Sequence, residues 1–260
     1  MSNDIATLGI NNPKMSNSLF RAKNLGTISN LNEYIAFRTA HGIDDKSYKD
    51  LYLGDYFIIK DGIYNVEWMV AHFDYYYNRG DDGNNVGGSR GVVLLPRTFC
   101  GQTKMNTTEH STAGGYKASV AHVTTCPAIA SALQTVLGSY LLSPTKLITN
   151  SVNANIPSMA GAGYNGAATG FEYTTNQCIL PNEVQMYGTT AWFSSAYDVG
   201  EACQKLAVFN FINQTEYGRY GVWLRSVAHA GAFVVSRYDC VADRYGANEN
   251  FRIRPLIYIG

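Results

Sequence analysis

The clearest alternation of apolar and polar positions lies between Gly54 and Asn78, in the segment GDYFIIKDGIYNVEWMVAHFDYYYN. The turn-forming run Lys60-Asp61-Gly62 divides this segment into two halves, which is the pattern of a β-hairpin. A short apolar run, GVVLLP, follows at residues 91–96 and ends at a proline. It predicts a buried strand.

Two segments show a helical period instead. Residues 127–142 begin with Pro127, a residue favoured in the first turn of a helix, and place apolar side chains on one stripe. A shorter helix is predicted over Asn30–Thr39, with four side chains on one face. The stripe of the first segment is Ile129, Leu133, Val136 and Leu137, and the face of the second is Leu31, Tyr34, Ile35 and Arg38.

The C-terminal half returns to strand-like segments. CILPNEVQMYG (178–188) predicts a strand that runs into a turn or short helix, and further strands are expected in KLAVFNFI (205–212), GVWLRSV (221–227), AFVVSRY (232–238) and RIRPLIYI (252–259). Strands on both sides of a central helical section indicate an α+β fold with a mostly antiparallel sheet, about two helices and long loops at 79–91 and 150–170. Residues 1–50, polar and rich in Asn and Ser, are predicted to be an attachment or oligomerisation segment, and 51–260 the main domain.

Composition narrows the classes of function. The 260 residues carry no net charge and only 15% are charged, so no basic surface is expected for nucleic acid. No apolar run is long enough for a membrane span, and the N-terminus lacks the pattern of a secretory signal. The chain is therefore expected to be made in a cytoplasm. Its 19 Tyr and 25 Gly fit either an adaptable contact surface or a loop-rich β protein.

Motifs for catalysis or metal binding are missing from the sequence. The five cysteines have no CxxC spacing, the five histidines have no HExxH spacing, and GxSxG, P-loop and GxGxxG patterns do not occur. His122 and Cys126 are four residues apart without a neighbouring carboxylate to orient them. The sequence predicts no enzyme, no cofactor and no structural metal. The acidic pairs Asp44-Asp45 and Asp81-Asp82 are read as solvated loop acids, with a surface Ca²⁺ as the alternative.

The stretch from Gly221 to Pro255, GVWLRSVAHAGAFVVSRYDCVADRYGANENFRIRP, begins as a core strand and continues as a mixture of Ala, Val, Ser, Arg, Tyr and Asp. Together with MNTTEHSTAGGYKAS (105–119), LLSPTKLITN (141–150), ILPNEVQMYG (179–188) and the hairpin segment, it resembles the C-type-lectin-fold domain of phage tail-fibre and head-fibre proteins. It is similar, too, to the variable proteins of diversity-generating retroelements. The resemblance covers roughly residues 51–260.

That resemblance implies a buried scaffold and a displayed surface. The scaffold residues it implies are Trp223, Leu224, Arg225, Arg254 and Pro255. The ligand-contact surface it implies spans Ala228 to Arg252, with His229, Ser236, Arg237, Tyr238, Asp239, Asp243, Arg244, Tyr245, Asn248 and Asn250 as contact residues. Ala232, Phe233, Val234, Val235 and Ala247 are expected to point inward. Relatives usually carry glycine immediately before the closing (V/I)RP, where this chain has Arg252.

The leading hypothesis is a non-enzymatic receptor-binding protein of a phage or prophage, located in the virion and forming a homotrimer. Its expected partners are a host cell-surface protein or glycan and other virion proteins, with no nucleic acid and no membrane insertion. Two alternatives remain open. One is a structural virion protein, such as a head-decoration or baseplate subunit, whose 228–252 surface is covered by a neighbour. The other is an enzyme of the formylglycine-generating type, for which Cys240 is the relevant residue.

Overall fold

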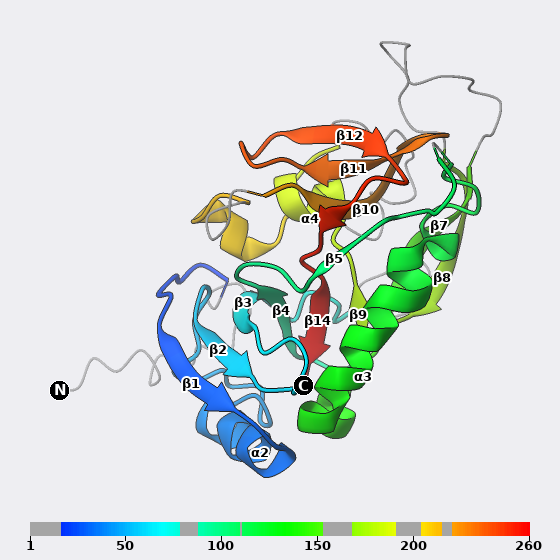
Figure 1. Ribbon diagram of the computed structural model, residues 1–260. Coiled ribbons are helices and arrows are strands. Elements are labelled where there is room, and N and C mark those ends of the chain that lie inside the picture. The colour runs from blue at the N-terminus through cyan, green and yellow to red at the C-terminus, as the bar shows by residue number, and fades with distance from the viewer. Residues whose placement is uncertain (1–16, 79–87, 110, 153–167, 191–203, 215–219) are drawn as a thin grey trace.

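The computed structural model describes residues 17–78, 88–109, 111–152, 168–190, 204–214 and 220–260. These residues form a seven-stranded sheet, a five-stranded sheet and a two-stranded ribbon, with helices packed around them (Figure 1). Nearly all strand pairs are antiparallel; the pairs β1–β2 and β10–β13 are parallel. The fold is therefore α+β with mostly antiparallel sheets and few helices, as predicted.

The seven-stranded sheet has the order β1-β2-β3-β4-β14-β6, and β9 also pairs with β14. Its strands are β1 (Asn24–Ile28), β2 (Tyr56–Ile59), β3 (Glu67–Phe73), β4 (Val92–Pro96), β6 (Leu141–Leu142), β9 (Cys178–Ile179) and β14 (Leu256–Ile259). The predicted hairpin is confirmed, with Phe57 opposite Trp68 across β2 and β3. The apolar runs of β4 and β14 are buried along their whole length, because they occupy the middle of the sheet.

The N-terminal segment belongs to this same sheet. Strand β1 pairs with β2, and helix α2 (Leu31–Ala40) contributes Tyr34 and Phe37 to the common core. The fold therefore does not divide at residue 50, where the polar composition had placed a boundary. The predicted helix is confirmed, but its predicted face is wrong: Leu31 and Ile35 are exposed, because α2 turns Tyr34 and Phe37 inward.

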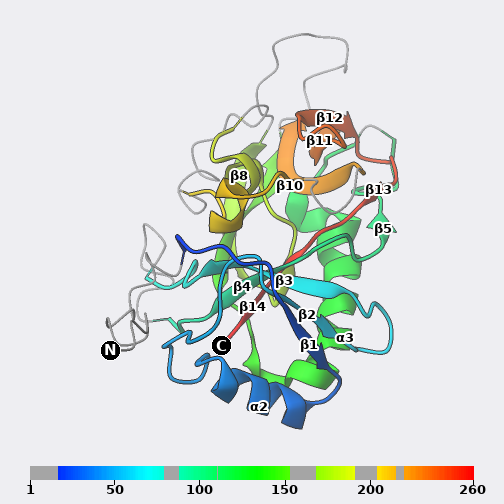
Figure 2. The ribbon, with the colours of Figure 1, turned by 90° about the vertical axis from the view of Figure 1, so that its left-hand side faces the viewer.

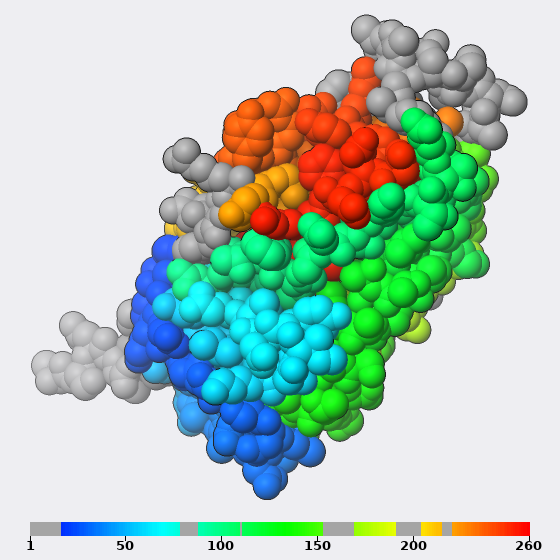
Figure 3. Space-filling view, viewed as in Figure 1, coloured from blue at the N-terminus to red at the C-terminus, as the bar shows by residue number. Residues whose placement is uncertain are grey.

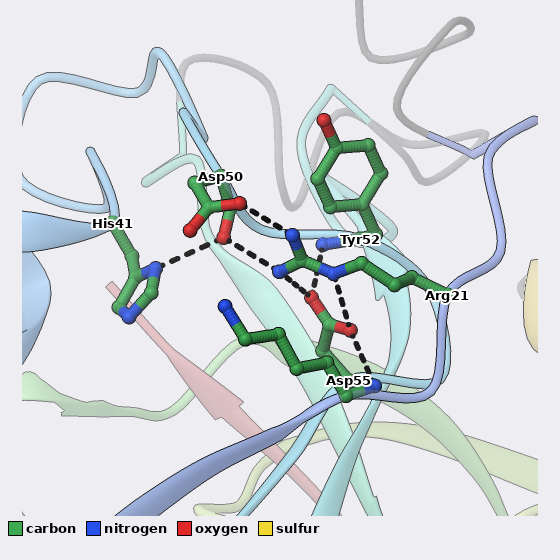
Figure 4. A network of polar contacts seen from close by, with 6 residues as sticks. Arg21, His41, Asp50, Tyr52 and Asp55 are labelled. Atoms are coloured by element: carbon green, nitrogen blue, oxygen red, sulfur yellow. Dashed lines mark hydrogen bonds and ion pairs between the residues drawn. The ribbon is translucent and has the colours of Figure 1, made fainter.

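A buried carboxylate ties the start of the described chain to the sheet (Figure 4). Asp55 accepts hydrogen bonds from Arg21 Nε (3.0 Å) and Nη2 (2.6 Å), and from the backbone N–H groups of Lys23 (2.8 Å) and Tyr52 (3.0 Å). Arg21 also pairs with the Asp50 carboxylate. The Asp50 carbonyl accepts a hydrogen bond from His41 Nδ1 at 3.0 Å, so this ring carries its proton on Nδ1.

The central helix is α3 (Cys126–Leu137), which runs along one side of the molecule (Figures 1 and 2). Its predicted stripe of Ile129, Leu133, Val136 and Leu137 is buried, and Pro127 lies in its first turn. Short helical turns flank it: η2 (Tyr116–Ala118), the π-helical η3 (Ala121–Thr125) and η4 (Gly138–Tyr140). Gly115 is required in this region, since a Cβ there would lie 2.6 Å from the Thr149 carbonyl oxygen.

The second sheet lies at the end of the molecule opposite α2 (Figure 2). Its strand order is β12-β11-β10-β13-β5. Its strands are β5 (Gln102–Thr103), β10 (Val222–His229), β11 (Ala232–Ser236), β12 (Ala242–Gly246) and β13 (Phe251–Arg252). The ribbon consists of β7 (Thr145–Val152) and β8 (Ala168–Thr175), and α4 (Glu183–Tyr187) packs on β10.

Two segments near this sheet differ from the sequence prediction. Residues 205–212 hold the 3-10 helix η5 (Ala207–Asn210) instead of a strand. The backbone N–H of Ala207 donates to Nδ1 of the buried His72 at 3.0 Å, which anchors η5 to β3. Most of the two predicted loops, at residues 79–87 and 153–167, lies outside the described residues.

Candidate functional site

The implied recognition surface stands on strand β10, all eight residues of which are buried. Trp223 packs edge-on against Phe251, with ring centroids 4.9 Å apart, and its indole N–H donates to the Thr103 carbonyl at 2.9 Å. Leu224 is fully buried beside it. The predicted core roles of Trp223 and Leu224 are confirmed. A strand buried on both faces gives the surface above it a rigid base.

Two buried arginines connect this base to the neighbouring segments. Arg225 Nη1 donates to the Leu147 carbonyl on β7 at 2.5 Å. Arg254 Nε donates to the Pro96 carbonyl on β4 at 2.9 Å, and its Nη1 donates to the Gln214 carbonyl. Pro255 is buried next to it. The guanidinium groups thus donate to backbone carbonyls of other elements, and Arg225, Arg254 and Pro255 are buried, as expected of scaffold residues.

The outermost part of the surface is the hairpin of β11 and β12, whose register runs from Ala232 opposite Gly246 to Ser236 opposite Ala242. Its turn is closed by hydrogen bonds from the Arg237 N–H to the Val241 carbonyl and from the Cys240 N–H to the Arg237 carbonyl. Tyr238 and Val241 remain 56% and 53% exposed at this turn. We call residues 237–241 the hairpin tip. The hairpin lies at the top of the space-filling view (Figure 3).

Arg237 forms ion pairs with two aspartates of the hairpin. Arg237 Nη1 lies 3.0 Å from the Asp243 carboxylate, and Nη2 lies 3.0 Å from the Asp239 carboxylate. The hydrogen bond with Asp243 is the main reason that the pKa of the Arg237 guanidinium is raised. Arg237, Asp239 and Asp243 therefore present one ion-paired group with a net charge of −1.

The remaining predicted contact residues lie at different depths. Tyr245 is half-buried, and its ring packs on Phe251 at a centroid distance of 4.7 Å. Arg244 and Asn248 are also half-buried, whereas Asn250 is exposed. The structure therefore brings Tyr238, Asp239 and Asn250 to the surface and leaves Tyr245 as a support for the sheet.

Two residues that were predicted to contact a ligand are buried, so this prediction is wrong for them. His229 is 3% exposed, and its Nδ1 accepts a hydrogen bond from the Gly231 N–H at 3.1 Å. Ser236 is 0% exposed, and its hydroxyl oxygen accepts from the Tyr187 hydroxyl at 2.7 Å. Both lie in strands covered on two faces, because α4 packs against this sheet. The residues expected to point inward, Ala232, Phe233, Val234, Val235 and Ala247, are all buried as predicted.

A cluster at the start of β10 and the end of β13 escaped the sequence analysis. The guanidinium carbon of Arg252 lies 3.1 Å from the ring centroid of Tyr220 and 4.2 Å from that of Phe99. We call these three residues the Arg252 cluster. Its members come from three distant segments, so no local pattern could group them. The only signal was Arg252 itself, which replaces the glycine usual at that position.

The structure also places the candidate catalytic groups. Cys126 is buried with its sulfur 3.9 Å from the Tyr116 hydroxyl, and His122 packs on the same tyrosine ring. Burial lowers the pKa of His122 below its ordinary value. Cys100, Cys126 and Cys178 are buried free thiols, and Cys240 is a half-buried one. Within the described ranges, no three His, Cys, Asp or Glu side chains are grouped so as to hold a metal ion.

None of the helices in the described part of the chain has the length and apolar character needed to cross a bilayer. The chain was compared with models of protein families, with curated proteins and with solved structures, and none of these comparisons gave a match.

Proposed function

We propose that this chain is a non-enzymatic receptor-binding protein of a phage or prophage virion, built on a C-type lectin-like fold, and that the hairpin tip belongs to its contact surface. The observation that carries the proposal is the exposure of Tyr238 and Val241 at the end of a hairpin whose base strand is completely buried. An exposed tyrosine on a rigid base offers large contact area at low entropic cost.

Three further features support this function. The scaffold residues Trp223, Arg225 and Arg254 lie in the core, where the resemblance expects them. Arg237 is already paired with Asp239 and Asp243, so a partner gains contact area at the tip without having to neutralise a free cation. Weak single-site binding by such a small tip would be reinforced by several copies in a homotrimer of the virion.

The test is binding of the purified protein to a panel of host cells. The variant Tyr238→Ala/Val241→Ser removes the tip contacts, and Ile63→Ser/Tyr173→Ala removes an exposed apolar residue and an exposed tyrosine elsewhere. We expect the tip variant to lose at least tenfold in cell binding and the control variant to bind like the native protein. Melting curves of all three should coincide, since surface substitutions have small effects on stability.

A structural virion protein is the second candidate, and β12 is the observation that favours it. This strand is at the edge of its sheet, and an edge strand is a site where a neighbouring chain can add a strand. If the native protein binds none of the hosts that its particle infects, the receptor-binding proposal fails and this candidate takes its place.

A further inference from the structure

The guanidinium group of Arg252 lies in the corner formed by two aromatic rings. Its central carbon is 3.1 Å from the Tyr220 centroid and 4.2 Å from the Phe99 centroid, and the two rings meet each other at 88°, so both lie within cation–π distance of it. Adjacent residues of a strand point to opposite faces, and Phe251 points toward Trp223 in the core. Arg252 therefore projects from the outer face of β13, where Tyr220 is 47% exposed.

No carboxylate of the described residues pairs with this cation. Nη1 is buried without a hydrogen-bond partner, and within the described ranges the side chain of Arg252 makes no hydrogen bond or ion pair. Glu249, three residues earlier and exposed, is not paired with it. Cation–π contact satisfies the charge only in part and leaves the N–H donors unused.

Other stacked arginines in the molecule show how such a group is usually completed. Arg21 lies over Tyr52 and pairs with Asp55, Arg90 lies near Tyr48 and pairs with Asp74, and Arg97 lies over Tyr56 and pairs with Glu67. Arg38 stacks on a single ring, that of Tyr140. Arg252 has two rings within 4.2 Å and, like Arg38, no carboxylate partner among the described residues.

We propose that the Arg252 cluster is a subsite for the carboxylate of a sugar acid. A guanidinium binds a carboxylate through a planar pair of hydrogen bonds, and Nε and Nη2 are the pair left for it because Nη1 is buried. The exposed part of Tyr220 offers an apolar surface against which the C–H groups of a pyranose ring can pack. This inference rests on the proposed function, because it names the chemical class of a cell-surface ligand.

The subsite and the hairpin tip belong to one sheet. Phe251, the residue before Arg252, packs on Tyr245 of β12, and β13 pairs with β10 at Val222. The core contacts of Trp223 thus support both places. A glycan bound at Arg252 would be held by the same rigid base as a contact at the tip.

The experiment is a titration of the native protein followed by the ¹H–¹⁵N signal of the Arg252 Nε–H group, assigned with Arg252→Lys. The probes are D-glucuronate, the neutral D-glucose, acetate and inorganic phosphate, all at equal ionic strength. We expect a saturable shift with D-glucuronate, none with D-glucose, and binding at least about tenfold weaker for acetate, which lacks the ring, and for phosphate. A native protein that shows no saturable shift with D-glucuronate overturns the inference, and so does tighter binding of phosphate.

Three variants separate a built site from general surface charge. Arg252→Gln should abolish D-glucuronate binding, and Arg252→Lys should weaken it about tenfold because an ammonium lacks the fork. Lys104→Gln removes an exposed cation next to β5, the strand that pairs with β13, and should leave binding unchanged. An equal loss of D-glucuronate binding in Lys104→Gln would show that net charge, not the Arg252 cluster, attracts the probe.

The two proposals fail separately. Loss of cell binding in the tip variant together with no D-glucuronate shift would leave the receptor-binding function standing and remove the sugar-acid subsite. A D-glucuronate shift without binding to any host cell would do the reverse. Thermal melts of the Arg252 variants confirm that they are folded; if Arg252→Gln does not fold, the native titration and Arg252→Lys decide the result.

Discussion

The molecule contains two clusters in which one arginine bridges two aspartates, and they differ in what they join. Arg21 bridges Asp50 and Asp55 at the N-terminal end (Figure 4), and Arg237 bridges Asp239 and Asp243 at the hairpin tip. In the first cluster the partners are 29 and 34 residues away in the chain. In the second they lie within the same hairpin, and all three side chains are partly exposed.

Burial decides how much each cluster contributes to the fold. Asp55 is fully buried and accepts two backbone N–H groups besides the arginine, so removing it leaves several donors without a partner. The charges of the hairpin tip are hydrated, and their attraction is screened by water and salt. The same combination of one arginine and two aspartates therefore fixes tertiary structure in the first cluster and adjusts surface charge in the second.

The largest effect is expected from Asp55→Ala. We predict a loss of roughly 3 kcal/mol in the free energy of unfolding, because a buried ion pair is broken and backbone donors lose their acceptor. Asp55→Asn is the matched control, since it keeps one acceptor oxygen, and should lose less. Chemical denaturation of both variants measures the difference. Equal stability of Asp55→Ala and the native protein would contradict the anchoring role.

A smaller effect is expected from Asp50, whose carboxyl pKa is held below its ordinary value mainly by the hydrogen bond from Arg21. A lowered folded-state pKa stabilises the protein above the unfolded-state pKa of about 3.9, and this contribution disappears as the pH falls through the folded-state pKa. Asp50→Asn should therefore melt below the native protein at pH 7. The two melting curves should converge in acid, and a gap that persists to about pH 2 would refute this account.

The smallest effect on stability is expected from Asp243→Ala. Exposed ion pairs contribute little to folding, so its melting temperature should match that of the native protein. The change frees Arg237 from one of its two carboxylates and takes the net charge of the group from −1 to 0. We expect cell binding to become less dependent on salt concentration, as measured by titrating NaCl in the binding assay. A large drop in melting temperature would show that the two clusters are alike after all.

The sequence predicted best where one local pattern was enough. The hairpin of β2 and β3, the stripe of α3 and the strands β4, β10 and β11 follow from apolar spacing, because their burial is what the spacing records. Strand β12 was missed, since its sequence Ala-Asp-Arg-Tyr-Gly is polar and half-buried at a sheet edge. Residues 205–212 were predicted as a strand because an apolar run gives no period.

The candidate site shows the same limit. Trp223 and Arg254 are buried as the resemblance implied, but His229 and Ser236, which the resemblance placed on the contact surface, are buried as well. Whether a polar side chain in a strand is exposed depends on the element that covers it, here the region of α4 and Tyr187. No position in the sequence of β10 or β11 carries that information.

By itself, the sequence determined the fold class, the helix α3 and the central strands, since each depends on the periodicity of a continuous segment. Only the tertiary structure decided that residues 17–50 share the core, that Arg237 is neutralised by its own hairpin, and that Arg252 lies between Phe99 and Tyr220. The physical reason is that charge pairing, stacking and burial depend on which segments meet in space, whereas periodicity depends only on neighbours along the chain.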